Sequence, residues 1–211
     1  MADDPIGQTD WVTIPLVLAS GSPRRRQLLS GLVADIMVLT PDVDETPAPG
    51  EDPRSYVERI SRDKAATVDS LTHDGAVIIA ADTCVTIDGR ILGKPNGSEA
   101  AAAMLRELSD RPHHTITGVT VRSPNGCDTI SVVTEVMFAA LSDDDIDWYV
   151  ATGEPLDKAG AYGLQGLAGV FVRRIEGSHS NVIGLPLAET AELLRRHGVA
   201  VAGSGPSAVV K

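Results

Sequence analysis

Hydrophobic and polar positions follow one another along this chain in segments that suit either strands or helices, which predicts an α/β fold. Short continuous apolar runs or long alternating ones indicate strands, and apolar stripes with a helical period indicate helices. The predicted strands are 13–19, 35–39, 75–82, a hairpin at 84–93, a pair within 115–141 around an Asn-Gly turn, and 170–175. The predicted helices are one that begins at residue 23, then 54–70, 98–110, 142–153 and 185–198. Helical crossovers combined with hairpins imply a mixed sheet flanked by helices.

The helix that begins at residue 23 opens with an unfavourable charge arrangement. Ser22 suits the N-cap and Pro23 the first helical position, but Arg24, Arg25 and Arg26 then follow at the positive end of the helix dipole. A bound anion would offset this conflict, because free backbone N–H groups and guanidinium groups would both contact it. Successive helical residues are about 100° apart, so we expect at most two of the arginines to face one ligand. The alternative is a solvated basic helix start.

Two segments whose apolar pattern predicts burial each contain one charged residue, and burying a charge without a partner costs free energy. Lys64 lies on the apolar stripe that Val57, Ile60 and Val68 form, so its ammonium must either reach solvent or meet a partner. Asp82 follows a continuous apolar run, which is typical of a strand that is buried on both faces and whose carboxyl end opens on a site. A carboxylate there can bind a metal or activate water, or it can cap the segment that starts at Thr83.

Two loops add further candidates. Asp42, Asp44 and Glu45 lie in a proline-rich acidic loop that can offer oxygen ligands to a divalent cation, although such loops are often only solvated. Lys94 stands between glycine and proline in a stiff turn after the hairpin. The segment around Lys94 is not a Walker A loop, because its glycine spacing is too short and no Ser or Thr follows the lysine.

A glycine-rich stretch at 157–169 contains the last candidate, Gln165. Glycines let a backbone approach a flat ligand closely, and the amide of Gln165 offers a donor and an acceptor for the edge of a nucleobase. An ordinary glycine-rich surface loop is the alternative. Taken with the arginines, the lysines and the acid pair, this stretch indicates a nucleoside polyphosphate as the ligand.

Other motifs do not support a competing chemistry. Cys84 and Cys127 are isolated and lack metal-ligand spacing, so we expect both to pack as small apolar residues. The acidic run at 142–147 is typical of a helix N-terminus. His113 and His114 would point to opposite faces of a strand, which suits no single metal ion. The chain has neither a GxSxG nor an HExxH motif.

Length and charge narrow the class of protein. A chain of 211 residues with 43% hydrophobic residues can bury one sizeable core. Eighteen basic and 29 acidic residues give a net charge of −11, which argues against a general role on nucleic acid or an anionic membrane. We found no apolar run of membrane-spanning length and no secretory signal, so we expect a cytoplasmic location. The expected organisation is an N-terminal extension at 1–13, one catalytic domain at 14–198 and a tail at 199–211.

The chain resembles a known family through a set of motifs that occur in order and at suitable spacing. These are SGSPRRRQLL, DVDET, the lysine of RDKA, AADT, GKP, KAGAYGLQG and GSHSNVIGLPL. The set is similar to that of the Maf-like, or septum-formation-inhibitor-type, nucleoside triphosphate pyrophosphatases, over about residues 16–198. The resemblance implies a twisted mixed sheet flanked by helices, with two lobes around a central cleft as in Maf and inosine triphosphatase-like proteins. It also implies metal-dependent hydrolysis of the α–β phosphoanhydride, which gives a nucleoside monophosphate and pyrophosphate.

The resemblance also implies roles for individual residues. The implied phosphate contacts are Ser20, Arg24, Arg25, Lys64 and Lys94. The implied acidic pair for Mg²⁺ or Mn²⁺ is Glu45 and Asp82, with Asp82 accepting a proton from water. Arg25, Thr83 and Gln165 are similar to the residues of the branch that acts on dTTP and UTP. The resemblance implies a homodimer as well. Two alternatives stay open, a nucleotide-binding regulator of septation with little turnover and an enzyme that removes modified pyrimidine triphosphates.

Overall fold

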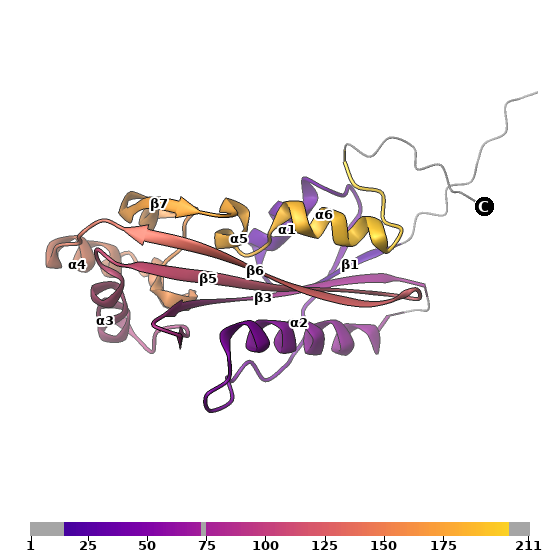
Figure 1. Cartoon of the computed structure of the whole chain (residues 1–211), viewed down its shortest axis with the longest axis horizontal. Coiled ribbons are helices and arrows are strands. Elements are labelled where there is room, and N and C mark those ends of the chain that lie inside the picture. The colour runs from indigo at the N-terminus through magenta and orange to yellow at the C-terminus, as the bar shows by residue number, and fades with distance from the viewer. Residues whose placement is uncertain (1–14, 73–74, 203–211) are drawn as a thin grey trace, which may run out of the picture.

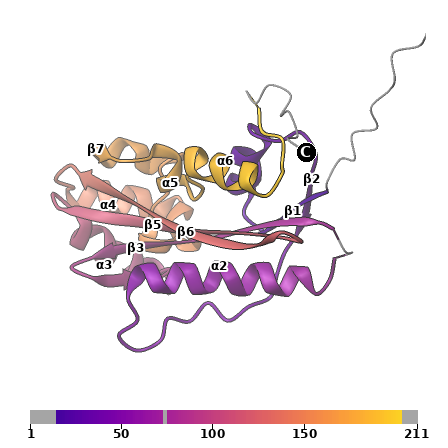
Figure 2. The same ribbon diagram turned by 45° about the vertical axis from the view of Figure 1, so that its right-hand side comes forward.

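The computed structural model describes residues 15–72 and 75–202, which form one seven-stranded sheet covered by helices (Figures 1 and 2). The strand order is β2-β1-β3-β5-β6-β7, and β4 pairs with β3. β1 runs parallel to β2 and β3, whereas the other pairs are antiparallel. The strands are β1 Leu16–Ala19, β2 Ile36–Leu39, β3 Val77–Ile87, β4 Arg90–Leu92, β5 Pro112–Ser123, β6 Gly126–Phe138 and β7 Val172–Glu176. The prediction of a mixed sheet flanked by helices is confirmed.

The helices cover the two faces of the sheet and one of its ends. α2 lies along one face, and α1, α5 and α6 lie on the other (Figures 1 and 2). α3 and α4 pack around the far end of the long strands. Their bounds are α1 Pro23–Ser30, α2 Pro53–Asp69, α3 Ser98–Leu108, α4 Asp143–Ala151, α5 His179–Ile183 and α6 Leu187–Arg196. Within the described ranges, no helix has the length and apolar character that a bilayer crossing requires.

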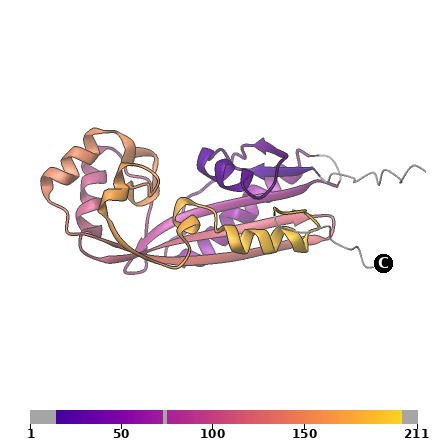
Figure 3. The same cartoon turned by 90° about the horizontal axis from the view of Figure 1, so that it is seen from above.

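The molecule has two lobes joined by long strands, as Figure 3 shows from above. The division arises on one edge of β3. β1 pairs with β3 over residues 77–80, and β4 pairs with it over residues 85–87, so no described strand covers residues 81–84 on that edge. On its other edge β3 pairs with β5 without interruption from Ile78 to Thr86. The sheet is therefore continuous on one side of β3 and open on the other, at the point where the lobes separate.

The position of Asp82 differs from the prediction. The apolar run does not end at Asp82, because β3 continues through it to Ile87 and includes the first half of the hairpin. Asp82 accordingly caps neither a helix nor a turn. The buried carboxylate is tolerated inside this strand because the ammonium of Lys64 in α2 pairs with it.

Helix α2 approaches the sheet unusually closely at Gly118 of β5. A Cβ placed on Gly118 would lie 2.5 Å from the carbonyl carbon of Val57 and 2.9 Å from the backbone nitrogen of Glu58, both in α2. The predicted stripe of α2 is confirmed, because Val57, Ile60 and Lys64 are all buried. Glycine in β5 therefore sets the depth at which this stripe meets the sheet.

Several smaller predictions have definite outcomes. Ser142 and Asp145 form a capping box at the start of α4, so the acidic run there is a helix cap, as predicted. α5 was not predicted. Val199 and Val201, which follow the expected boundary at residue 198, are buried in the core with α6. Cys84 is buried, but Cys127 is exposed and does not pack in the core. The N-terminal extension and most of the C-terminal tail lie outside the described residues.

His113 of β5 supplies a pH dependence to the stability of the fold. Its side chain is buried and its Nε2 lies 2.9 Å from the hydroxyl of Tyr162. Burial lowers the pKa of His113 from 6.5 to about 4, so the folded chain keeps the ring neutral. Between these two values the unfolded chain binds a proton that the folded chain does not bind. The free energy of unfolding should therefore fall as the pH drops through this window, by at most about 3 kcal/mol.

Replacing His113 with Gln tests this pH dependence. We expect denaturant unfolding of His113→Gln to show a smaller loss of stability from pH 7 to pH 4 than the unmodified chain shows. The comparison of the two slopes cancels the carboxylates that titrate in the same range. Equal slopes for the two chains would contradict the prediction.

Candidate active site

A cleft of about 460 Å³ lies at the open edge of β3, between the two lobes. Its walls come from the turn between β1 and α1, the loop after β2, α2, β3, the turn after β4, the glycine-rich stretch and the end of α5. All of the predicted site residues line this one cleft, namely Ser20, Arg24, Arg25, Glu45, Lys64, Asp82, Thr83, Lys94 and Gln165. Segments far apart in the sequence therefore meet here.

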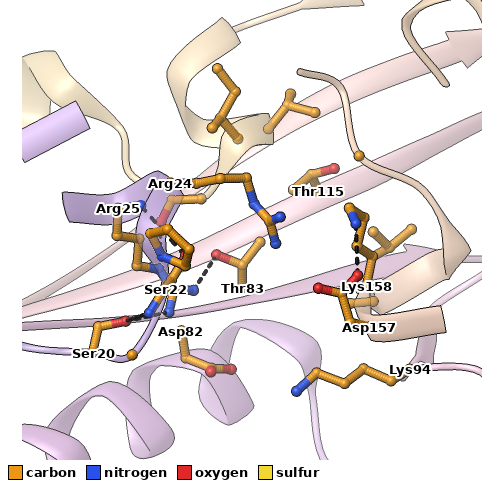
Figure 4. A pocket seen from close by; sticks show the side chains of 18 of the residues that line it. Ser20, Ser22, Arg24, Arg25, Asp82, Thr83, Lys94, Thr115, Asp157 and Lys158 are labelled. Carbon is orange, nitrogen blue, oxygen red and sulfur yellow. Dashed lines mark hydrogen bonds and ion pairs between the residues drawn. The ribbon is translucent and has the colours of Figure 1, made fainter. Parts of the chain in front are cut away.

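The start of α1 faces the cleft. The Ser22 hydroxyl accepts a hydrogen bond from the backbone nitrogen of Arg25, and Pro23 begins the helix, as predicted. Arg24 and Arg25 line the cleft, whereas Arg26 is exposed and is not among its lining residues. This agrees with the expectation that at most two of the arginines face one ligand. Arg24 extends into the cleft (Figure 4) and forms no hydrogen bond or ion pair with another described residue.

Arg25, in contrast, is held by the protein itself. Its Nε donates to the carbonyl oxygen of Gly184 at 2.9 Å, its Nη1 to the Ser20 hydroxyl at 3.2 Å and its Nη2 to the Thr83 hydroxyl at 2.9 Å. Desolvation lowers the pKa of Arg25, and the charges of Asp82 and Glu45 oppose this shift. The guanidinium thus connects α1 to β3 and to the end of α5, and it fixes the position of Thr83 beside Asp82.

Lys64 lies between the two acids of the cleft. Its Nζ is 2.7 Å from Asp82 Oδ1 and 2.6 Å from Glu45 Oε1. Desolvation raises the pKa of Glu45, but the hydrogen bond and charge of Lys64, with the charges of Lys94 and Arg25, outweigh it and leave that pKa below its ordinary value. The sequence left open whether the Lys64 ammonium reaches solvent or meets a partner, and the structure shows that it meets a partner. Its ammonium contacts both carboxylates.

The donor set of the cleft fits a magnesium or manganese ion that also binds phosphate oxygens. Glu45 and Asp82 contact the same ammonium, so their carboxylates converge on one position. Among the described residues no group of three or more His, Cys, Asp or Glu side chains is arranged to hold a metal. Magnesium commonly uses one or two carboxylates and takes its other ligands from phosphate and water. Asp42 and Asp44 do not line the cleft.

The opposite lobe contributes a second cation and an amide. Lys94 extends from the turn after β4 toward Asp82 (Figure 4), and it forms no ion pair with a described residue. Gln165 lines the cleft in the glycine-rich stretch, and its side chain is hydrogen-bonded to no described residue. Arg24, Lys94 and Gln165 are therefore among the lining residues whose polar side chains are available to a ligand.

Sequence reasoning missed some of the lining residues. Thr115, Asp157, Lys158 and Tyr162 also line the cleft. Lys158 donates to Asp157 Oδ1 at 2.7 Å (Figure 4). It also donates to the carbonyl oxygen of Glu154 at 2.7 Å. The sequence does contain a signal for two of them, because the glycine-rich stretch at 157–169 begins with the charged residues Asp157 and Lys158.

The interpretation of the glycines in this stretch needs a correction. The glycines were expected to admit a flat ligand. Instead, the space beside Gly160 holds the Val85 side chain, the space beside Gly163 holds that of Lys158, and the space beside Gly166 holds that of Glu154. These glycines serve close packing within the chain, whereas Gln165 lines the cleft.

Comparisons of the sequence with known proteins identify one family. The sequence model of the family described as Maf-like protein matches residues 15–197. A dTTP/UTP pyrophosphatase of Anaeromyxobacter dehalogenans (strain 2CP-C) is 56% identical over 187 residues, which cover 87% of this chain and 94% of that protein. A dTTP/UTP pyrophosphatase of Vibrio cholerae serotype O1 is 49% identical over 181 residues, which cover 86% of this chain and 97% of that protein. The solved structure of the Staphylococcus aureus Ham1 protein is 17% identical with a TM-score of 0.49, and the match covers 86% of this chain and 98% of that one.

Proposed function

The chain belongs to the Maf-like protein family, and we propose that it hydrolyses dTTP and UTP to the nucleoside monophosphate and pyrophosphate. The observation that carries this proposal is the meeting of Arg24, Lys94 and the Glu45–Asp82 pair in one cleft. Cationic side chains bind the phosphate oxygens of a triphosphate, and carboxylates bind the divalent cation that accompanies it. Relatives at 44–56% identity are named dTTP/UTP pyrophosphatase, which supports the choice of substrate.

In the proposed reaction Asp82 accepts a proton from the attacking water. Lys64 already occupies Asp82 Oδ1, so Oδ2 is the oxygen that takes the proton. Arg24 and Lys94 bind phosphate oxygens from opposite lobes and stabilise the charge on the leaving pyrophosphate. The capped start of α1 adds backbone N–H groups with the same polarity. Ser20 and Arg25 shape the phosphate side of the cleft.

Glu45 and Asp82 are the residues that would hold Mg²⁺ or Mn²⁺. When bound, the ion would neutralise phosphate charge and polarise the bond that breaks. Lys64 holds the two carboxylates together, because its positive charge offsets the repulsion between them. The homodimer and the cytoplasmic location stay predictions of the sequence.

A pyrophosphate-release assay tests the proposed function. We expect the full chain to release pyrophosphate from dTTP and UTP faster than from dATP, GTP or CTP, and only with Mg²⁺ or Mn²⁺ present. Modified pyrimidine triphosphates belong in the same panel. Saturable UTP binding without turnover in Mg²⁺ would contradict the proposal and indicate a regulator.

Gln165 is the proposed reader of the pyrimidine edge. An amide that pairs with the base favours the correct substrate through about one or two hydrogen bonds. We expect Gln165→Ala to lower kcat/KM for UTP by roughly tenfold, the equivalent of about 1.4 kcal/mol, and to narrow the preference for UTP over GTP. Steady-state kinetics with both nucleotides measure this ratio. An unchanged ratio would remove Gln165 from the recognition of the base.

A further inference from the structure

Glu154 lies outside the catalytic groups, yet its carboxylate is fully engaged beneath the glycine-rich stretch. Its Oε1 accepts a hydrogen bond from the Tyr149 hydroxyl at 2.9 Å, and its Oε2 accepts one from the backbone nitrogen of Leu167 at 3.0 Å. The carboxylate forms no ion pair with a described residue. Tyr149 is fully buried in α4, and burial followed by the bond to Glu154 raises its pKa, so its hydroxyl stays a donor. Glu154 thus fastens the backbone after Gln165 to a rigid helix.

The backbone on both sides of Gln165 rests directly on side chains. A Cβ on Gly166 would lie 2.5 Å from Glu154 Cδ, and a Cβ on Gly163 would lie 2.6 Å from Lys158 Cε. Lys158 is itself held, because its Nζ donates to the carbonyl oxygen of Glu154 at 2.7 Å. The contact at Gly166 therefore depends on the Glu154 side chain, and the contact at Gly163 depends on a lysine held by the Glu154 backbone and by Asp157.

Gln165 lies between these two supports, lines the cleft and has no hydrogen-bonding partner among the described residues. An exposed glutamine on a glycine-rich backbone has many conformations, and ordering it when a ligand binds costs free energy. A backbone that is already fixed reduces that cost.

Given the proposed function, we propose that Glu154 is a positioning residue for base recognition: it holds the 163–167 backbone so that the Gln165 amide meets the pyrimidine edge. Glu154 is not among the residues that line the cleft. Its loss should act on affinity and on discrimination between bases, not on the chemical step.

The experiment is a double-mutant cycle between Glu154 and Gln165 in the full chain. We expect Glu154→Ala to raise KM for UTP about three- to tenfold and to narrow the UTP-to-GTP ratio of kcat/KM, with kcat for UTP within about twofold. Glu154→Gln should restore the wild-type values, because its amide can accept from Leu167 and donate to the Tyr149 oxygen. In the Gln165→Ala background, Glu154→Ala should have little further effect on the ratio.

Tyr149→Phe provides a milder variant in case Glu154→Ala does not fold. Tyr149→Phe removes one of the two hydrogen bonds that the Glu154 carboxylate accepts. The UTP-to-GTP ratio of kcat/KM should therefore fall less than in Glu154→Ala, and Tm should change little. Isothermal titration calorimetry with UTP in EDTA measures binding without turnover. The affinity should be highest for the unmodified chain, lower for Tyr149→Phe and lowest for Glu154→Ala.

The outcomes separate this inference from the proposed function. A wild-type chain that releases no pyrophosphate from any nucleotide would overturn both. Wild-type turnover with an unchanged ratio in Glu154→Ala would overturn the inference alone. An equal loss of kcat/KM for UTP and GTP, or a full additional effect in the Gln165→Ala background, would show a structural role and would also overturn it.

Discussion

Asp82→Asn should abolish most turnover while leaving nucleotide binding nearly intact. Asparagine keeps the shape of the side chain and an oxygen that can accept from Lys64 Nζ, which lies 2.7 Å from Oδ1 in the present structure. It cannot take a proton from water at the second position. General-base assistance is commonly worth about a hundredfold to ten-thousandfold, so kcat for UTP should fall by that factor. Steady-state pyrophosphate release gives kcat and KM separately.

A second Asp-to-Asn change on the same hairpin serves as the control. Asp88 lies at the turn between β3 and β4, is exposed and has a positive φ of 51°, a conformation that asparagine also adopts. Asp88→Asn should leave kcat unchanged. A substitution at Asp82 that changed only KM would contradict the proposed proton acceptor.

Gly118→Ala should destabilise the fold more than other small changes in the sheet. The new Cβ would lie 2.5 Å from the carbonyl carbon of Val57 and 2.9 Å from the backbone nitrogen of Glu58. Both are backbone atoms, so the strain cannot be relieved by turning a side chain, and α2 must move off the sheet. We expect a loss near the upper end of the usual overpacking cost, about 3 kcal/mol, and a fall in Tm of about 6–12 °C.

Gly93→Ala is the matched control for this substitution. A Cβ on Gly93 meets nothing within 4 Å, and its φ lies outside the left-handed region. Its Tm should stay within a few degrees of the unmodified chain, as expected for a substitution without a steric cost. Gly118→Ala should also lower activity in proportion to the displacement of Lys64, which α2 carries. A Tm equal to that of Gly93→Ala would contradict the close approach.

Local signals were sufficient to predict most elements and several residues of the cleft, whereas Ser20 and Thr83 were expected only from the resemblance to the Maf-like family. The helical spacing of Val57, Ile60 and Lys64 placed the lysine on a buried face, and the structure confirms it. The partners of that lysine could not be predicted, because Glu45 and Asp82 reach it from a loop and a strand whose neighbours depend on the order of the sheet.

Two further errors have the same physical origin. An apolar run followed by an acid looks alike whether a strand ends or continues, so β3 was predicted to stop at Asp82. Glycine spacing likewise reveals that something approaches the backbone but not what does so. At Gly163 and Gly166 the approaching groups belong to Lys158 and Glu154 of the same chain. Short-range patterns determine local conformation, whereas these contacts depend on distant segments.

The strands that pass between the lobes have a consequence for how the lobes are joined. β3, β5 and β6 run unbroken from one lobe to the other, and no loop among the described residues replaces them at the junction. Rotation of one lobe against the other would have to twist or bend these paired strands, so the lobes are joined by the sheet and not by a loop hinge. The distance between the two lobes is therefore set by the folded sheet.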